Sequence, residues 1–203
     1  MKSLRFAMPA IFVAAALVAA ACGGSGSSSS SAPPTSASGT GQAVFAVKDA
    51  AANMGSVTSV QVTIDSVRAH AQGGAWTTVS TQTQTFDLLK LRANNSVQLL
   101  AQANLDAGFY DQVDLNVSKT VVVDAQGQHD AKLPSNKLQL KGLVTVKQGS
   151  TATATFDFIA DESLHVTGNG EYIMAPVIQF DAKSDAQATV KSDKTVEIFG
   201  KDT

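Results

Sequence analysis

Cys22, the only cysteine of the chain, is the residue whose surroundings predict a definite chemistry. It follows a short basic start, Lys2 and Arg5, and an apolar run from Phe6 to Ala21. That run has about sixteen residues, whereas a membrane-spanning helix needs about twenty, so the pattern is typical of an export signal. A cysteine directly behind such a signal favours lipidation of its thiol, as in bacterial lipoproteins. We therefore expect residues 1–21 to be a signal peptide and Cys22 to be held in a membrane by lipid.

A second interpretation of this segment stays open. Three residues before the cysteine, where lipoprotein signals usually have leucine, the chain has Ala19, and the Ala19–Ala21 triplet also fits ordinary signal cleavage. The next segment favours the anchor, because Gly23 to Gly41 contains only Gly, Ser, Pro, Thr and Ala and suits a flexible tether. In enterobacteria an aspartate after the cysteine signals retention in the inner membrane. Gly23 therefore favours the outer membrane, in a host that has one.

The side chains that usually perform catalysis are isolated in this sequence. His70, His129 and His165 each stand alone, so no zinc-binding spacing such as His-x-x-x-His occurs. The chain also lacks a Gly-x-Ser-x-Gly elbow and a glycine-rich loop that opens a helix around a phosphate. We expect the three histidines to be solvated surface residues, and we expect no enzyme activity and no cofactor.

Two groups of acidic residues could hold a calcium ion, which prefers carboxylate oxygens from loops. Neither group matches a calcium-loop pattern such as Asp-x-Asp-x-Asp-Gly. They predict turn capping and solubility, and no metal site. The groups are Asp106, Asp111 and Asp114, around a Gly-x-Tyr segment, and Asp157, Asp161 and Glu162, around an expected hairpin.

Aromatic residues make up only 6% of the chain, whereas sugar-binding faces usually need exposed flat rings. Trp76 follows two glycines at the expected start of a strand, and core or edge packing is its expected use. Tyr172 is in phase with Met174 and Phe180, so it is expected in the core as well.

The net charge of the chain argues against partners that are themselves strongly negative. The whole chain has 15 basic and 17 acidic side chains, and without Lys2 and Arg5 the balance is 13 to 17, a net charge near −4. This acidic balance argues against nucleic acid and against an anionic membrane surface as partners.

The elements that position these residues are predicted to be strands, because apolar and polar residues alternate almost throughout from Gln42. The phase of the alternation slips near Asp65 and Ser66, which predicts a bulge. A short helical turn is expected from Leu89 to Asn95, and Asn169-Gly170 is the sharpest hairpin signal. The expected apolar faces include Val97, Leu99, Ala101, Ala103 and Leu105 in one strand, and Ala152, Ala154, Phe156 and Phe158 in another.

Many short strands with turn signals between them predict an all-β fold, an antiparallel β-sandwich of immunoglobulin-like or transthyretin-like style. The expected organisation is a signal peptide at residues 1–21, a lipidated tether at 22–41 and the sandwich at 42–182. Residues 183–203 are expected to form a C-terminal hairpin or tail, either an integral part of the sandwich or a loose appendage. We favour the integral alternative.

Several short segments, in this order and spacing, resemble a family of bacterial lipoprotein domains known only as a domain of unknown function. The resemblance covers Gln42 to Phe180 and lacks the proline that family members often have where this chain has Ala51. It implies an exported β-sandwich and supplies no catalytic residue. The segments are Lys48-Asp49-Ala50, Val60-Gln61-Val62, Trp76, Phe86-Asp87-Leu88-Leu89-Lys90-Leu91, Leu105-Asp106-Ala107-Gly108-Phe109-Tyr110 and Ala175-Pro176-Val177-Ile178.

The segment from Leu105 to Tyr110 also resembles a motif found where strands begin in transthyretin-like sandwiches. Gly108 can adopt a positive φ and turn the chain sharply into the next strand. Tyr110 can bury its ring and donate its hydroxyl to nearby backbone, as tyrosine corners do. We expect both residues to be structural.

Three functional expectations follow. The favoured one is a lipid-anchored protein of the bacterial cell envelope whose sandwich serves binding, adhesion or structure without catalysis, with a protein or glycan as ligand. A carbohydrate-binding module would instead place Trp76 and at least one tyrosine on one exposed face. A pilus-like or scaffold subunit would have an exposed strand edge, with the segment from Asp185 to Phe199 as candidate donor or plug.

Overall fold

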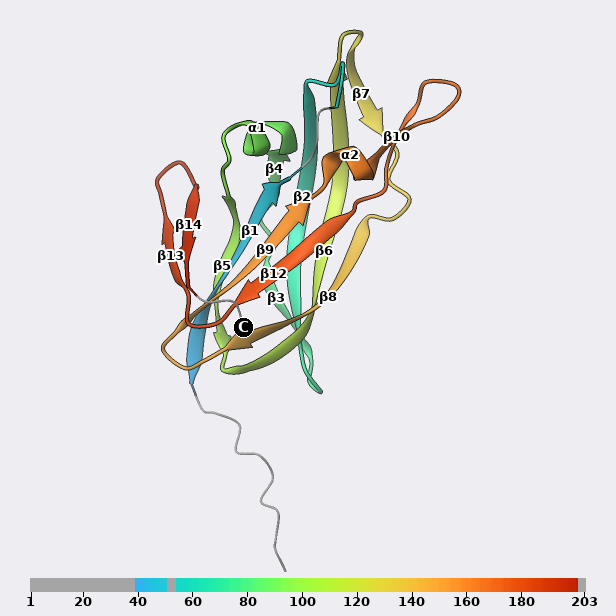
Figure 1. The fold of residues 1–203 in the computed structure, drawn as a ribbon. Helices are drawn as coiled ribbons and strands as arrows, with labels where there is room; N and C mark the ends of the chain where they lie inside the picture. The colour runs from blue at the N-terminus through green and yellow to red at the C-terminus, as the bar shows by residue number, and fades with distance from the viewer. Residues whose placement is uncertain (1–38, 51–53, 201–203) are drawn as a thin grey trace, which may run out of the picture. The chain divides into compact units, whose positions relative to one another are not determined.

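The fold is an all-β sandwich, which confirms the class predicted from the sequence (Figure 1). The structure, a computed structural model, describes residues 39–50 and 54–200. The predicted signal peptide, Cys22 and most of the predicted tether lie outside the described residues.

The first sheet has four strands in the order β12-β9-β1-β5. These are β1 (Thr40–Asp49), β5 (Gln98–Asp106), β9 (Thr151–Phe158) and β12 (Ile178–Lys183). β1 pairs with β9 in parallel, and the other pairs in this sheet are antiparallel. β5 is therefore an edge strand, and β1 is its only partner within the sheet.

The second sheet has six strands built around β2 (Ser59–Ala71) and the long β6 (Gly108–Asp124). β3 (Trp76–Ser80) and β4 (Gln84–Asp87) both pair with β2. β7 (Gly127–Ala131) and β8 (Lys137–Val146) both pair with β6. The pairing of β2 with β6 shifts register around Ile64 and Ser66, where the sequence predicts a bulge.

Short elements complete the described chain. The predicted helical turn is α1 (Leu88–Ala93), which begins where the Asp87 carboxylate accepts a hydrogen bond of 3.2 Å from the backbone N–H of Lys90. The others are α2 (Ala160–Ser163), β10 (Leu164–Val166), β11 (Tyr172–Met174), β13 (Gln187–Val190) and β14 (Val196–Phe199). β10 and β11 form the hairpin predicted at Asn169-Gly170, where Gly170 has φ of 83°.

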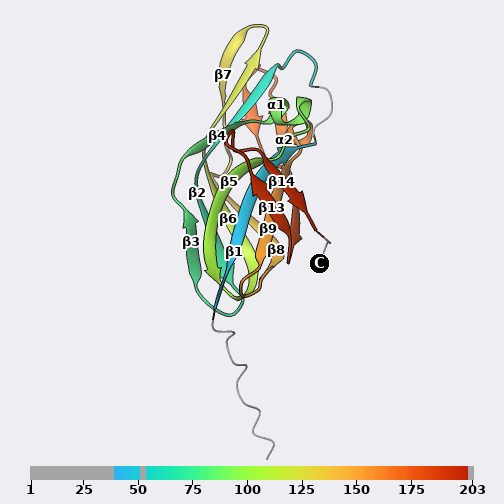
Figure 2. The same ribbon diagram turned by 90° about the vertical axis from the view of Figure 1, so that its left-hand side faces the viewer.

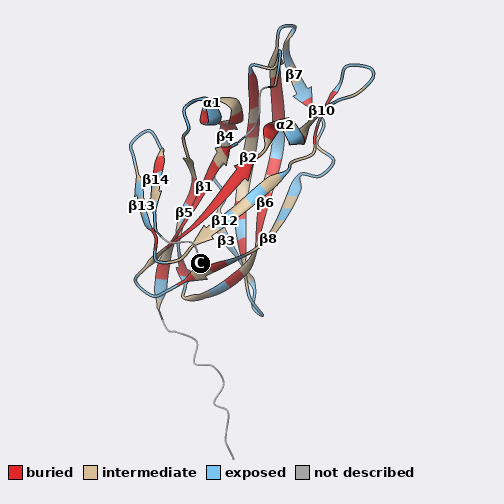
Figure 3. Cartoon of the chain, in the orientation of Figure 1, coloured by how far each residue is buried: buried red, intermediate tan, exposed pale blue. Residues whose placement is uncertain are grey.

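The main core lies between the two sheets, which Figures 2 and 3 show from two directions. Its largest members include Phe45, Phe86, Phe156 and Phe158, each at most 1% exposed. Phe156 and Phe158 share their face with the buried Ala152 and Ala154, as the alternation predicts.

One predicted face is wrong. Ala101, Ala103 and Leu105 of β5 belong to the main core, but Leu99 packs on the opposite face and Leu100 enters the core instead. The register between β1 and β5 shifts between Phe45 and Ala46. Because of this irregularity, the residues before Leu100 point to the opposite faces of the sheet from those that the alternation predicts.

The C-terminal hairpin of β13 and β14 covers the outer face of the first sheet. Its Val196 is 3% exposed and forms a second apolar cluster with Val44 and Ala46 of β1. On the same outer face, Thr155 is only 6% exposed, although the alternation predicts a solvated position. The β9 strand is therefore buried on both faces, which a period of two does not reveal.

Candidate functional site

The predicted Gly108 and Tyr110 corner is a structural feature beside the start of β6. Tyr110 is 4% exposed, and its hydroxyl donates a hydrogen bond of 3.0 Å to the backbone carbonyl of Asp106. Burial is the main cause that raises the pKa of this hydroxyl, and the nearby Asp106 carboxylate adds to it. The role expected for Gly108 is wrong, because its φ is not positive and a Cβ there would meet open space.

The two acidic groups do not converge on a metal. In the described part of the chain, no three His, Cys, Asp or Glu side chains lie close enough to hold one ion. Asp111 lies 2.7 Å from His70, and Asp114 forms an ion pair of 2.9 Å with Lys137. Asp157 pairs with Lys48 at 2.9 Å, whereas Asp161 and Glu162 belong to α2.

No helix among the described residues is long and apolar enough to cross a membrane.

Only one of the three histidines is the simple surface residue expected from the sequence. His165 is exposed, but His70 is bound to Asp111, and the Nε2 atom of His129 lies 3.0 Å from Asp124 Oδ1. Asp124, whose side chain is 5% exposed, also accepts a hydrogen bond of 2.6 Å from the Tyr172 hydroxyl. These contacts tie the β6–β7 hairpin to β11.

This Tyr172–Asp124 contact predicts a pH dependence of stability. The hydrogen bond from Tyr172 is the main cause that lowers the pKa of Asp124, and the same bond raises the pKa of Tyr172. A carboxyl whose pKa is lowered on folding stabilises the protein above its unfolded pKa, and this contribution disappears as the pH falls through the folded value. Tyr172→Phe should therefore reduce the loss of Tm between about pH 7 and pH 3. Thermal melts of both chains check this, and an unchanged pH profile would contradict it.

The condition set for a carbohydrate-binding face is not met. Trp76 is half-buried at the start of β3, and its ring contacts His70 at a centroid distance of 5.0 Å. The chain has two tyrosines, and Tyr110 and Tyr172 are both buried, at 4% and 8% exposed. No tyrosine therefore shares an exposed face with Trp76.

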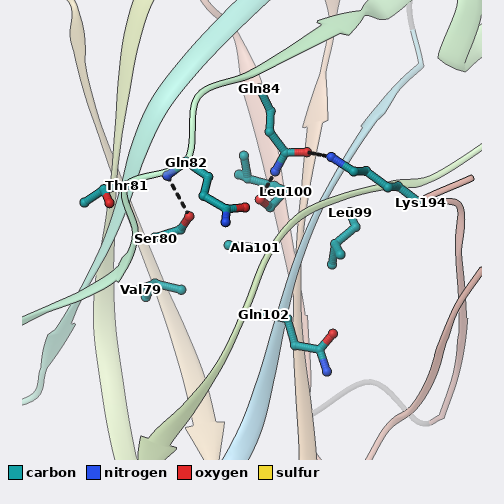
Figure 4. Close-up of a pocket in the computed structure, with 10 residues that line it drawn as sticks. All are labelled: Val79, Ser80, Thr81, Gln82, Gln84, Leu99, Leu100, Ala101, Gln102 and Lys194. Carbon is teal, nitrogen blue, oxygen red and sulfur yellow. Dashed lines mark hydrogen bonds between the residues drawn. The ribbon is translucent and has the colours of Figure 1, made fainter. Parts of the chain in front are cut away.

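A groove lies between the edge of β5 and the edge of the second sheet (Figure 4). Its volume is about 420 Å³ and it is open along one side. The lining is mostly uncharged and polar, with Lys194 as the only charged side chain. It consists of Val79, Ser80, Thr81, Gln82, Gln84, Leu99, Leu100, Ala101, Gln102 and Lys194.

Gln84 spans the groove and joins three segments of the chain. Its Nε2 donates a short hydrogen bond to the backbone carbonyl of Leu100, and its Oε1 accepts one of 3.1 Å from Lys194 Nζ. Figure 4 shows Gln84 between these two partners. Gln84 thus joins β4 to β5 and to the turn of the C-terminal hairpin.

The turn of the C-terminal hairpin pairs with one end of β5 as a strand would. The backbone N–H of Leu99 donates to the carbonyl of Lys194 at 2.8 Å, and the N–H of Val196 donates to the carbonyl of Val97 at 2.8 Å. Gln98 and Thr195 thus form an antiparallel bridge. The turn thus occupies one end of the β5 edge that faces away from β1.

A second hollow of about 370 Å³ lies on the other side of the same turn. It is lined by Thr85, Gln98 and Thr195, the chain neighbours of Gln84, Leu99 and Lys194 in the groove, and by residues of α1. The hairpin turn thus separates this second hollow from the groove, and both hollows lie between β4 and β5.

The opposite side of the sandwich, between β8 and β12, is closed. There the ring of Phe180 lies directly on Gly142, so even a methyl group at Gly142 would collide with it. Glycine is needed at this position because another chain segment approaches the backbone closely. The two sides of the sandwich therefore differ at these positions: Phe180 packs on the backbone of β8, whereas a groove lies beside β5.

The comparisons with known proteins identify a family and add no activity. The model of a family described as Domain of unknown function (DUF4382) matches residues 40–176, which is more than half of the chain. The chain belongs to this family, as the resemblance of the sequence predicts. No curated protein matches the chain, and no solved structure matches it.

Sequence reasoning missed the groove. Its lining combines three glutamines, a serine, a threonine and a lysine with four aliphatic residues from separate segments, and none of these forms a recognisable motif. The only available signal was the expectation that the segment from Asp185 to Phe199 could act as a strand donor or plug.

Proposed function

We propose that the protein is a lipid-anchored module of the bacterial cell envelope that binds an extended peptide segment of a partner protein beside β5. The single observation that supports this most is the pairing of Lys194–Val196 with Val97 and Leu99, which places a strand-like neighbour on the β5 edge. A peptide segment laid beside Ala101 and Gln102 would continue that row of backbone hydrogen bonds, past the Leu100 carbonyl that Gln84 already occupies.

The lining of the groove suits a peptide better than other ligands. Glutamine and hydroxyl side chains exchange hydrogen bonds with peptide groups, and the single positive charge of Lys194 leaves the groove without strong charge selection. None of the lining residues is aromatic, whereas sugar binding usually uses a flat ring. The lining also contains no acid and base pair, so the arrangement supports binding and not catalysis.

A selection of phage-displayed dodecapeptides against the purified chain tests this proposal. Within Leu100–Gln102, the selected peptides should protect from hydrogen exchange those amides that point away from β1, because an added strand shields them. Gln102→Lys should weaken these peptides at least tenfold, because a lysine at a strand edge disfavours pairing.

The matched control is Gln128→Lys, which places the same charge on the exposed face of β7 at another edge strand. This variant should leave peptide binding unchanged. Peptides that bind equally well to both variants, or that leave β5 unprotected, would show that the groove is not a strand-binding site.

The anchor is part of the same proposal and is supported by the signal pattern and the Gly/Ser-rich spacer, which precede the described residues. We expect the wild-type chain, expressed in a bacterium, to take up a clickable fatty acid, and Cys22→Ser to lose the label and leave the membrane fraction. A single amino-acid change should suffice because the chain has no other cysteine. A wild-type chain that takes up no label would contradict the lipoprotein interpretation.

A further inference from the structure

A small pocket lies on the outer face of the second sheet, away from the groove and from the hollow beside α1. Its volume is about 180 Å³, and residues of β2, β6 and β8 line it. They are Ser66, Arg68, Asp114, Leu115, Asn116 and Lys137. The proposed peptide site uses none of these residues.

The floor of the pocket contains a buried carboxylate with one oxygen that has no donor. Asp114 is 4% exposed, and Lys137 Nζ forms an ion pair with its Oδ2 at 2.9 Å. The other oxygen, Oδ1, has no hydrogen-bond partner among the described residues. A buried carboxylate oxygen without a donor is rare in folded proteins, so it points to a donor that is not part of the chain.

The rim of the pocket presents a cation that the protein does not neutralise. Arg68 lies directly opposite Asp114 in the β2–β6 pairing, yet it is exposed and has no ion pair with any described residue. Its guanidinium carbon lies 5.1 Å from the centre of the Trp76 ring, and Lys137 Nζ lies 5.6 Å from the same centre. The ring thus holds both cations beside the pocket.

We propose that this pocket binds a small carboxylate that also carries hydroxyl groups, such as a sugar acid. The carboxylate of the ligand pairs with the Arg68 guanidinium, whose fork matches it in two hydrogen bonds. A hydroxyl of the ligand donates to Asp114, which supplies the missing donor. Asn116 and Ser66 offer neutral partners for further hydroxyls. A plain anion would gain the pairing with Arg68 but would meet the Asp114 charge without donating to it.

Trp76 makes the test direct, because it is the only tryptophan of the chain and contacts both cations. Its fluorescence is followed while the purified chain is titrated to about 50 mM with glucuronate, gluconate, glucose or acetate, at constant ionic strength. We expect saturation with a dissociation constant on the order of 1 mM for at least one of the two hydroxylated carboxylates. Glucose and acetate should bind at least tenfold more weakly, since each lacks one of the two groups.

The two hydroxylated carboxylates distinguish a ring-shaped sugar acid from an open chain, and binding of either supports the proposal. Arg68→Gln should reduce the affinity at least tenfold, and Asp114→Asn should do the same by replacing the charged acceptor with a weaker, neutral amide. Lys119→Gln is the matched control, because it removes an exposed cation of β6 that pairs with Asp130 outside the pocket. Should Asp114→Asn fail to fold, Arg68→Gln still tests the proposal, because Arg68 is exposed and its replacement does not disturb the core.

If acetate binds as tightly as glucuronate, the pocket attracts any small anion and the hydroxyl groups add nothing to the affinity. This result would overturn the proposal. Absence of any saturable change with glucuronate and gluconate would overturn it as well, and so would equal losses in Arg68→Gln and Lys119→Gln. None of these results would affect the peptide groove, whose test uses other residues and another readout.

Discussion

Phe156→Ala is expected to cost about 3–5 kcal/mol of unfolding free energy, the largest loss from any single truncation considered for this protein. Phe156 is 0% exposed in the middle of β9, and its ring packs between Phe45 at a centroid distance of 6.4 Å and Phe180 at 5.5 Å. Removing the ring leaves a cavity that neighbours on paired strands cannot fill. For a domain of this size the Tm should fall by roughly 6–20 °C.

The matched control is Phe109→Ala, which removes the same ring from a position that is 53% exposed. This change should cost less than about 1 kcal/mol. Urea denaturation of both variants measures the difference. Equal losses would mean that the Phe156 ring does not lie in the core between the two sheets as described. Thr155→Ala would be a poor control, because Thr155 is itself buried beneath the outer layer.

Val196→Asp is expected to have the second largest effect, a loss of about 3 kcal/mol. Val196 is 3% exposed against Val44 and Ala46, and a carboxylate placed there has no charged partner in the apolar cluster. The hairpin can avoid this burial only by leaving the sheet, which exposes the outer face of β1. Hydrogen exchange should then show loss of protection at the Leu99 amide, which donates to the Lys194 carbonyl.

Gln187→Asp adds the same charge to an exposed position of the same hairpin and should change stability by at most about 0.5 kcal/mol. If Val196→Asp were equally harmless, the hairpin would be a loose appendage and not part of the folded unit. The variant also bears on the peptide groove. Because the hairpin turn occupies one end of β5, its release should strengthen binding of the selected peptides.

The class of fold could be predicted from the amino-acid sequence, because the alternation of apolar and polar residues is a local property of each strand. The bulge near Asp65, the helical turn before Asn95 and the hairpin at Asn169-Gly170 could be predicted as well, since each depends on neighbouring residues. The core position of Phe156 and Phe158 followed from the same period. The family assignment was within reach because its short segments keep their order along the chain.

Which strand faces are covered, and where a groove or pocket forms, depend on the packing of distant segments and could not be predicted from the local pattern. The alternation places Thr155 in solvent, and the residue is buried because a hairpin about forty residues later in the chain lies over it. The groove beside β5 and the pocket around Asp114 combine residues from separate strands, and their polar side chains look ordinary in each strand alone. Local patterns specify strands, whereas the pairing of distant strands determines which polar groups meet, and this depends on the packing of the whole domain.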